Sequence, residues 1–124
     1  MKEQNRNIAI LGASPKPDRY ANMAQKLLME KGYRVYPINP FHERIENVAC
    51  YKKVTDITEN IDTVTVYMNP TRLAEMLADI IKKKPRRIIL NPGTESDDLK
   101  KTLEPHGISV LEACTLVLLK TGQF

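Results

Sequence analysis

Short apolar runs alternate along this chain with longer segments in which apolar residues recur every three or four positions. The runs have the length and the near-continuous apolar content of strands that helices cover on both faces. Five strands are predicted, at Asn7–Leu11, Tyr33–Ile38, Asp62–Met68, Arg87–Leu90 and Ile108–Leu111. The first four end at a glycine or at an asparagine followed by a proline, which are strong turn signals.

Helical spacing fills the gaps between these strands. A first helix, which Asp18 or a neighbour can cap, ends near Lys31, because Gly32 follows it. Its apolar stripe consists of Tyr20, Met23, Ala24, Leu27 and Leu28. A second helix is predicted from the stripe Leu73, Met76, Leu77, Ile80 and Ile81, and a third starts at Thr94 or Ser96 and ends at Gly107. Residues 41–60 show neither spacing and are expected to contain at most a short helical turn. The segment Thr115 to Lys120 suits a short helix or a closing strand.

Strands that alternate with helices at this spacing predict an α/β fold made of right-handed βαβ units. We expect a Rossmann-like three-layer sandwich with a five-stranded parallel sheet in the order 3-2-1-4-5, formed by residues 1–124 as a single domain. In such sheets a ligand lies outside the carboxyl ends of the strands, near the first strand. The loops that follow the strands are therefore the places to look for a site.

Composition narrows the setting and the partner. Two cysteines, no apolar leader and no long apolar span favour a reduced, cytoplasmic protein that does not enter a membrane. The net charge of +4 and the pI near 9.1 favour an anionic ligand. Much of that charge lies in residues 82–87, between a helix end and a strand start, on the edge opposite the expected ligand. We interpret that run as a solvated surface and expect no nucleic-acid partner.

The loop from Gly12 to Arg19 follows the first strand and precedes the first helix. A glycine lets a ligand approach the backbone, and Ser14 and Lys16 offer a hydroxyl and an ammonium group to phosphate oxygens. The helix start adds free N–H groups and the positive end of its dipole. This loop is therefore the predicted phosphate site, although an ordinary turn between strand and helix has the same pattern.

The usual dinucleotide fingerprint is incomplete in this loop. That fingerprint needs three spaced glycines, and an acid about 20 residues later that holds the ribose hydroxyls. Only Gly12 is present, and the second strand ends in Asn39-Pro40. Ordinary NAD recognition is thus disfavoured.

Asparagine–proline pairs end three strands on the expected ligand edge, at Asn39-Pro40, Asn69-Pro70 and Asn91-Pro92. Proline fixes φ and removes an N–H group, so these strand ends would be rigid. Each pair can simply terminate its strand, but three on one edge suggest a preformed groove for a flat adenine ring.

No catalytic or metal-binding pattern is visible. Cys50 and Cys114 have no histidine at ligand spacing, and His42 and His106 are isolated. Cys114 lies just past the fifth strand, where either a role beside the ligand or simple burial is open. Without a nucleophile, a base and an orienting group, a binding module is a better interpretation than an enzyme.

Four segments resemble the stand-alone CoA-binding domain proteins, a family similar to the N-terminal domain of the succinyl-CoA ligase alpha subunit: GASPKPDRYAN at 12–22, GYRVYPINP at 32–40, ACY at 49–51 and LEAC at 111–114. The resemblance implies that CoA lies over the strand ends. It implies phosphate contacts at Gly12, Ala13, Ser14, Lys16 and Arg19, a groove border at Asn39 and Pro40, and adenosine contacts at Met68, Asn69 and Pro70. Asn91, Gly93 and Cys114 complete the candidate cofactor-binding residues.

The chain departs from that family's pattern at Asn91-Pro92-Gly93 and in its last residues, TLVLLKTGQF. The ligase reaction also uses a phosphorylated histidine from a further domain that this sequence lacks. The leading hypothesis is therefore non-catalytic binding of CoA or an acyl-CoA, with no metal. The alternatives are an NAD(P)-binding redox sensor or small oxidoreductase, and a subunit that supplies CoA to a partner enzyme. A homodimer remains open.

Overall fold

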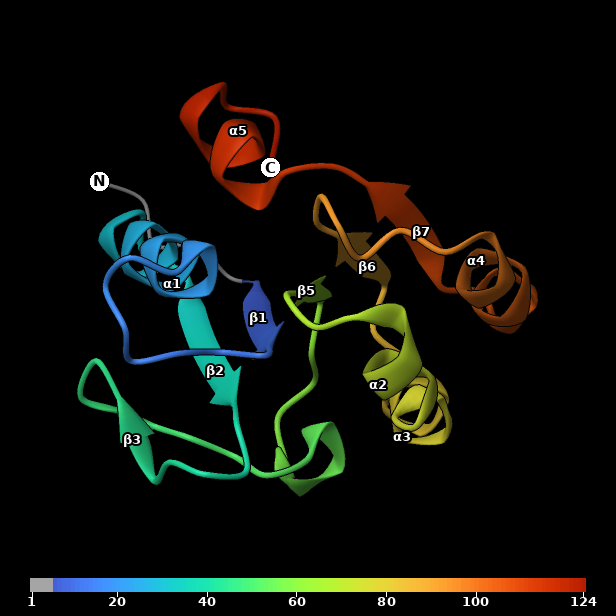
Figure 1. The fold of residues 1–124 in the computed structure, drawn as a ribbon, viewed down its shortest axis with the longest axis horizontal. Helices are drawn as coiled ribbons and strands as arrows, with labels where there is room; N and C mark the ends of the chain where they lie inside the picture. The colour runs from blue at the N-terminus through green and yellow to red at the C-terminus, as the bar shows by residue number, and fades with distance from the viewer. Residues whose placement is uncertain (1–5) are drawn as a thin grey trace.

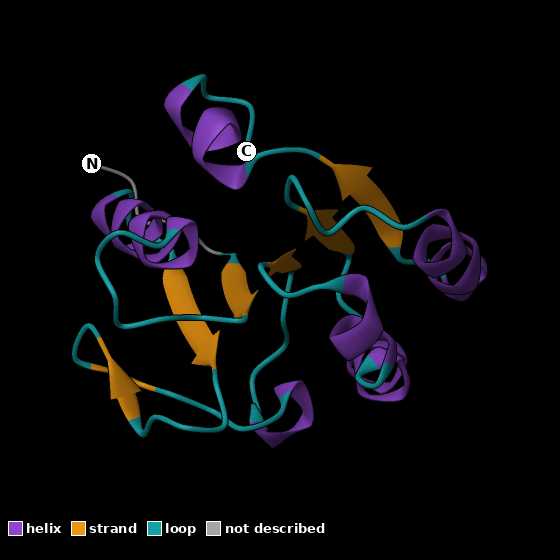
Figure 2. Cartoon of the chain, in the orientation of Figure 1, coloured by secondary structure: helices purple, strands orange, loops and turns teal. Residues whose placement is uncertain are grey.

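The computed structural model describes residues 6–124, and a parallel five-stranded sheet forms its centre (Figures 1 and 2). The strands are β1 (Asn7–Leu11), β2 (Arg34–Ile38), β5 (Thr63–Val66), β6 (Arg87–Leu90) and β7 (Ser109–Glu112). They lie in the order β2-β1-β5-β6-β7, with β1 paired to both β2 and β5. All five predicted strands are present within a residue or two of their expected bounds.

The Rossmann-like parallel sheet is confirmed, with a correction to which segment fills its third place. Beyond β2, Tyr51 forms a single parallel bridge with Ile38. Counted as a third strand, this bridge gives the Rossmann order 3-2-1-4-5 and continues it to a sixth strand. The segment predicted as the third strand, Asp62 to Met68, instead lies on the other side of β1 as β5. The prediction missed the bridge because one paired residue leaves no apolar periodicity.

Alternate residues of each strand face the two helical layers. Ile8 and Ile10 pack toward α1 (Tyr20–Glu30) and α5 (Thr115–Lys120), whereas Ala9 and Leu11 pack toward the opposite layer. That layer contains α2 (Pro70–Ala74), α3 (Leu77–Lys83) and α4 (Asp97–Leu103). Figure 1 shows the two groups of helices on opposite sides of the sheet. Because both faces are covered, the strands are apolar almost throughout.

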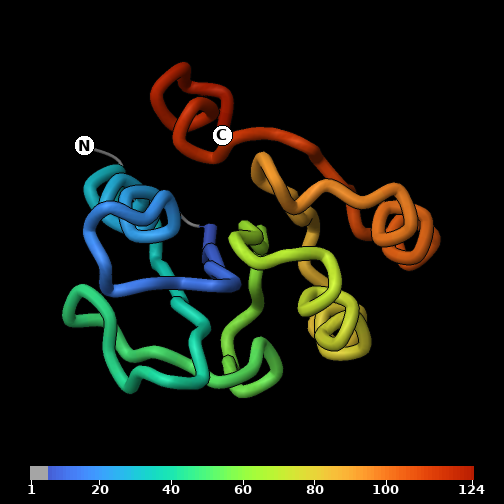
Figure 3. Tube along the Cα trace, viewed as in Figure 1, coloured from blue at the N-terminus to red at the C-terminus, as the bar shows by residue number. Residues whose placement is uncertain are grey.

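The segment after β2 contains more structure than the sequence predicted. β3 (Arg44–Ile45) and β4 (Val48–Ala49) form a small antiparallel hairpin, and the short 3₁₀ turn Val54–Asp56 follows it. A second 3₁₀ turn, Glu104–His106, follows α4. The Cα trace shows the hairpin extending outside β2 (Figure 3). The helical turn was expected, but the hairpin was not.

Two further segments, the second predicted helix and the C-terminal tail, complete the comparison with the predicted elements. The stripe from Leu73 to Ile81 is divided between α2 and α3, which are separated at Glu75 and Met76. The tail from Thr115 forms helix α5, so the closing strand is excluded. No helix within residues 6–124 is both long enough and apolar enough to cross a lipid bilayer.

Candidate functional site

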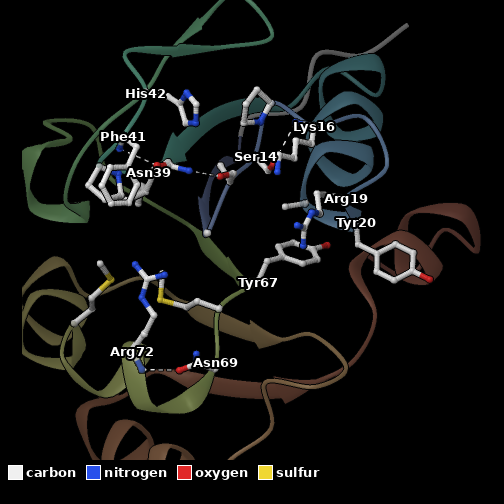
Figure 4. A pocket seen from close by; sticks show the side chains of 18 residues that line it. Ser14, Lys16, Arg19, Tyr20, Asn39, Phe41, His42, Tyr67, Asn69 and Arg72 are labelled. Atoms are coloured by element: carbon white, nitrogen blue, oxygen red, sulfur yellow. Dashed lines mark hydrogen bonds between the residues drawn. The ribbon is translucent and has the colours of Figure 1, made fainter.

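A cavity of about 640 Å³ opens at the carboxyl ends of β1, β2 and β5 (Figure 4). Three chain segments form its walls: the loop after β1 with the start of α1, the segment after β2, and the end of β5 with α2. The lining residues are Gly12, Ala13, Ser14, Pro15, Lys16, Arg19, Tyr20, Ala21, Ile38, Asn39, Pro40, Phe41, His42, Tyr67, Met68, Asn69, Arg72 and Met76. The cavity thus lies where a Rossmann-like sheet places its ligand.

The loop after β1 has a conformation that only glycine accommodates at its first position. Gly12 has φ +81°, and a Cβ atom there would lie 2.7 Å from the carbonyl oxygen of Tyr67. The loop then turns on itself, because the Ser14 hydroxyl accepts a hydrogen bond from the Lys16 N–H at 3.1 Å and the Lys16 carbonyl accepts one from the Arg19 N–H at 3.1 Å. Local hydrogen bonds therefore hold the predicted phosphate loop in shape.

The start of α1 carries no side-chain cap, contrary to the expectation for Asp18. Arg19 occupies the cap position and its side chain makes no capping hydrogen bond. The first residues of the helix, Tyr20 and Ala21, line the cavity. An uncapped helix start directs N–H groups and a partial positive charge toward this space, which suits an anionic group.

Asn39 joins the ends of β1 and β2. Its amide donates a hydrogen bond to the Ala13 carbonyl at 2.8 Å, and its side-chain oxygen accepts one from the Phe41 N–H at 2.8 Å. The asparagine therefore fixes the phosphate loop relative to the segment that carries Pro40, Phe41 and His42. These bonds give Asn39 a structural role at the cavity border.

The opposite wall is the start of α2. Asn69 caps this helix by accepting a hydrogen bond from the Arg72 N–H at 2.9 Å, and Pro70 occupies its first turn. The asparagine–proline pair therefore starts a helix here as well as ending a strand. Arg72 lies in the first turn of α2, and its side chain extends along the cavity wall (Figure 4).

The lining is strongly asymmetric in charge. Lys16, Arg19 and Arg72 all line the cavity, and within residues 6–124 no aspartate or glutamate does. None of these three side chains makes an ion pair within that part of the chain. Like charges that face one cavity without a counter-charge create a positive potential that attracts an anion.

Tyr67 lies at the end of β5 between these walls. Its hydroxyl is buried and makes no hydrogen bond of normal geometry within the described chain. Burial raises the pKa of Tyr67 to about 12, and the nearby hydroxyls of Thr115 and Thr65 only partly oppose that effect. The phenol is therefore neutral at physiological pH.

Nine of the thirteen predicted site residues line this cavity, and four do not. Those outside it are Pro70, Asn91, Gly93 and Cys114. Asn91 is buried, its amide donates to the Thr65 hydroxyl at 2.7 Å, and its side-chain oxygen accepts from the Thr115 N–H at 2.9 Å. Asn91 thus ties β6 to β5 and to the start of α5, and Cys114 lies beside it at the cap position of α5.

The sequence analysis missed Tyr67, Phe41, His42 and Arg72 as lining residues. Phe41, His42 and Arg72 follow predicted strand ends on the ligand edge, and Tyr67 is the penultimate residue of the strand predicted at Asp62–Met68. Position at or near a strand end is the signal that could have found them. Arg72 in particular lies near a strand end, as Lys16 and Arg19 do. Among the loops that line the cavity, however, only the one after the first strand carries a recognisable glycine turn.

No three His, Cys, Asp or Glu side chains among residues 6–124 lie close enough together to hold a metal ion. A second concavity lies along the outside of β2, where Met29, Tyr33, Tyr36 and Tyr51 contribute to its lining. That groove is away from the ends of β1 and β5. The cavity at the strand ends is therefore the candidate site.

A Rossmann-like sheet with a cationic cavity at its carboxyl edge defines a nucleotide-binding class of domain. Residues 6–120 match the CoA binding domain family, and the chain belongs to that family. The family resemblance seen in the sequence is therefore confirmed.

Individual relatives agree with this assignment. A solved structure, a hypothetical protein from Pyrococcus horikoshii OT3, is 33% identical, has a TM-score of 0.88, and is matched over 92% of this chain and 81% of that one. The uncharacterized protein YneT of Bacillus subtilis is 23% identical over 88% of this chain and 81% of its own.

A third relative is much longer. The ADP-forming acetate–CoA ligase of Methanocaldococcus jannaschii is 30% identical over 63% of this chain, but the match spans only 11% of the ligase. The similarity therefore concerns one domain of that enzyme. It relates this chain to the CoA-binding domain of ADP-forming acetyl-CoA synthetases and leaves the ligase reaction outside the comparison.

Proposed function

We propose that this chain binds CoA or an acyl-CoA in the cavity at the ends of β1, β2 and β5, without catalysing a reaction on it. The diphosphate lies against Ser14, Lys16 and Arg19 and the uncapped start of α1. The adenosine lies between the Asn39–Pro40 border and Met68. The observation that carries this proposal is the cavity's lining, which contains three cations and, among residues 6–124, no carboxylate.

The same lining argues against NAD as the preferred ligand. Domains that bind NAD hold the free ribose diol with an acid placed about 20 residues after the glycine turn. At the end of β2 this chain has Asn39, whose side-chain amide and oxygen both bond to the protein's own backbone. CoA carries an additional phosphate on its ribose, so a cationic cavity favours it electrostatically.

A role in binding alone is supported by the lack of a catalytic arrangement in the cavity. Its lining residues with acid–base chemistry are Lys16, Tyr20, His42 and Tyr67. Within residues 6–124 no lining carboxylate is available to orient any of them. The Tyr67 pKa near 12 also makes this phenol a poor base at neutral pH.

Titration calorimetry with CoA, acetyl-CoA and NAD tests the proposal. We expect CoA and acetyl-CoA to bind more tightly than NAD, and Lys16→Ala to weaken CoA binding by about 1–3 kcal/mol through loss of a charge-assisted contact. Lys101→Ala, which removes an exposed charge on α4, is the matched control and should leave the affinity unchanged. NAD binding as tight as CoA binding would overturn the proposal in favour of the NAD(P)-dependent alternative.

A further inference from the structure

Arg72 is a cation that the diphosphate site does not explain. Lys16 and Arg19 belong to the loop after β1 and to the α1 cap position, whereas Arg72 belongs to α2 on the other side of β5. Figure 4 shows its side chain on the wall opposite Ser14 and Lys16, with Tyr67 between the two walls. The cavity therefore has cationic groups on two separate walls.

The structure also holds the backbone of Arg72 firmly. Its N–H is fixed by the Asn69 side chain at 2.9 Å, and Pro70 restricts the turn that precedes it. The guanidinium itself makes no hydrogen bond or ion pair within residues 6–124. An arginine whose backbone is fixed and whose planar guanidinium has no protein partner is well suited to a phosphate, which it can contact through two parallel N–H groups.

One compact diphosphate at the start of α1 leaves the other wall without an anionic partner. Two cationic walls match a ligand with two anionic groups that are held apart by a spacer. CoA has this composition, because its ribose separates the 5′-diphosphate from the 3′-phosphate. Dephospho-CoA has the diphosphate and lacks the second anion.

We infer that Arg72 binds the ribose 3′-phosphate of CoA and so makes the site selective for CoA over dephospho-CoA. This inference rests on the proposed function and adds the origin of its specificity. A phosphate monoester carries more negative charge at neutral pH than each phosphate of a diphosphate chain, so the guanidinium gains most from this partner.

The main competing role for Arg72 is stacking on the adenine ring. Phe41 also borders this part of the cavity and is 81% exposed, so a base could lie between the phenyl ring and the guanidinium. Stacking would not depend on the 3′-phosphate. The two roles therefore predict different dependence on that one group of the ligand.

Titration calorimetry of CoA and dephospho-CoA against the natural chain, Arg72→Gln, Arg72→Lys, Lys16→Ala and Lys101→Ala separates these roles. We expect the natural chain to bind CoA about ten- to a hundredfold more tightly than dephospho-CoA. Arg72→Gln should remove most of that preference by weakening CoA alone, and Arg72→Lys should retain part of it. Lys16→Ala should weaken both ligands by the same factor, and Lys101→Ala neither.

Equal losses for both ligands in Arg72→Gln would overturn the inference and assign Arg72 to the base. A preference for CoA that Arg72→Gln leaves unchanged would overturn it as well, while leaving CoA binding itself intact. Failure of the natural chain to bind either ligand would overturn the proposed function together with this inference. Arg72 is exposed, and unfolding midpoints equal to that of the natural chain would show that its variants fold normally.

Discussion

Gly12 determines how closely two strand ends approach each other at the floor of the cavity. Its φ of +81° lies in the region that side chains disfavour, and an added Cβ would lie 2.7 Å from the oxygen and 2.9 Å from the carbon of the Tyr67 carbonyl. The obstacle is backbone, which a rotamer change cannot relieve. The glycine is therefore required by both conformation and space.

Gly12→Ala should therefore destabilise the protein more than an alanine at another glycine with the same φ. Gly107 also has φ +81°, but nothing lies within 4 Å of a Cβ placed there. We expect Gly107→Ala to lower the free energy of unfolding by about 1–2 kcal/mol from conformation alone. Gly12→Ala should cost at least about 1 kcal/mol more because of the overlap with Tyr67. Urea denaturation measures the free energy of unfolding of both variants. Equal losses would show that the backbone at Tyr67 moves to make room for the added Cβ at little cost.

The β3–β4 hairpin is attached to α1 by two buried amides. Asn22 donates hydrogen bonds to the Ser14 carbonyl and to the Glu46 carboxylate, both at 3.0 Å, and Gln25 donates to the Ile45 carbonyl at 3.1 Å. Both amide side chains are fully buried. Asn22 therefore links the hairpin to the phosphate loop.

Asn22→Ala should lower both stability and CoA affinity. Two partly buried acceptors lose their donor, which costs about 1–3 kcal/mol of unfolding free energy, and release of the Ser14 carbonyl loosens the phosphate loop. Glu46→Ala is the control, because it removes the bond from Asn22 to the hairpin while leaving the bond from Asn22 to Ser14. Denaturation and calorimetry on both variants would show the difference. An equal loss of CoA affinity in Glu46→Ala would mean that the hairpin, and not the loop contact, supports the site.

At the scale of the whole molecule, the two edges of the sheet use positive charge differently. Cations face an open cavity at the carboxyl edge, whereas three of those in residues 82–87 are bound by the protein at the other edge. There Lys83 donates to the Ile57 carbonyl, Arg86 pairs with Asp62 at 2.9 Å, and Arg87 donates to the Thr63 hydroxyl at 2.8 Å. This basic run therefore fastens the starts of β5 and β6.

The Asp62–Arg86 pair should make stability depend on pH. Burial alone would raise the pKa of Asp62, but hydrogen bonds from Arg86 and Thr63 and the charges of Arg86 and Arg6 outweigh it, so the net pKa is lowered. A lowered pKa in the folded state stabilises the protein above the pKa of the unfolded state, and this contribution disappears as the pH falls through the folded value.

Asp62→Asn should thus lower the free energy of unfolding at pH 7 by no more than about 1 kcal/mol, since Arg86 is largely exposed. The difference from the natural chain should shrink as the solution is acidified below the usual aspartate range. Urea denaturation across that pH series measures it. Asp18→Asn removes an exposed carboxylate that has no partner among residues 6–124 and should show a smaller difference. A constant difference at all pH values would contradict the electrostatic explanation.

Most of the fold and half of the residues that line the cavity could be predicted because they depend on local signals. Strand and helix periodicity, the turn at Gly12 and the cap at Ser96 are each contained within a few residues, and the structure has all of them. The hairpin, the Tyr51 bridge and the division of the second predicted helix depend on contacts between segments distant in sequence. No local pattern records such contacts.

The sequence by itself determined that this is a parallel α/β domain with a glycine turn after its first strand, because apolar periodicity and a glycine turn are local properties. Only the tertiary structure decided that Arg72, Phe41 and Tyr67 line the same cavity as Lys16, and that Asn91 is a buried connector outside it. The physical reason is that the order of the strands in the sheet determines which strand ends are neighbours, and therefore which side chains lie close together. That choice follows from packing the whole sheet between its two helical layers.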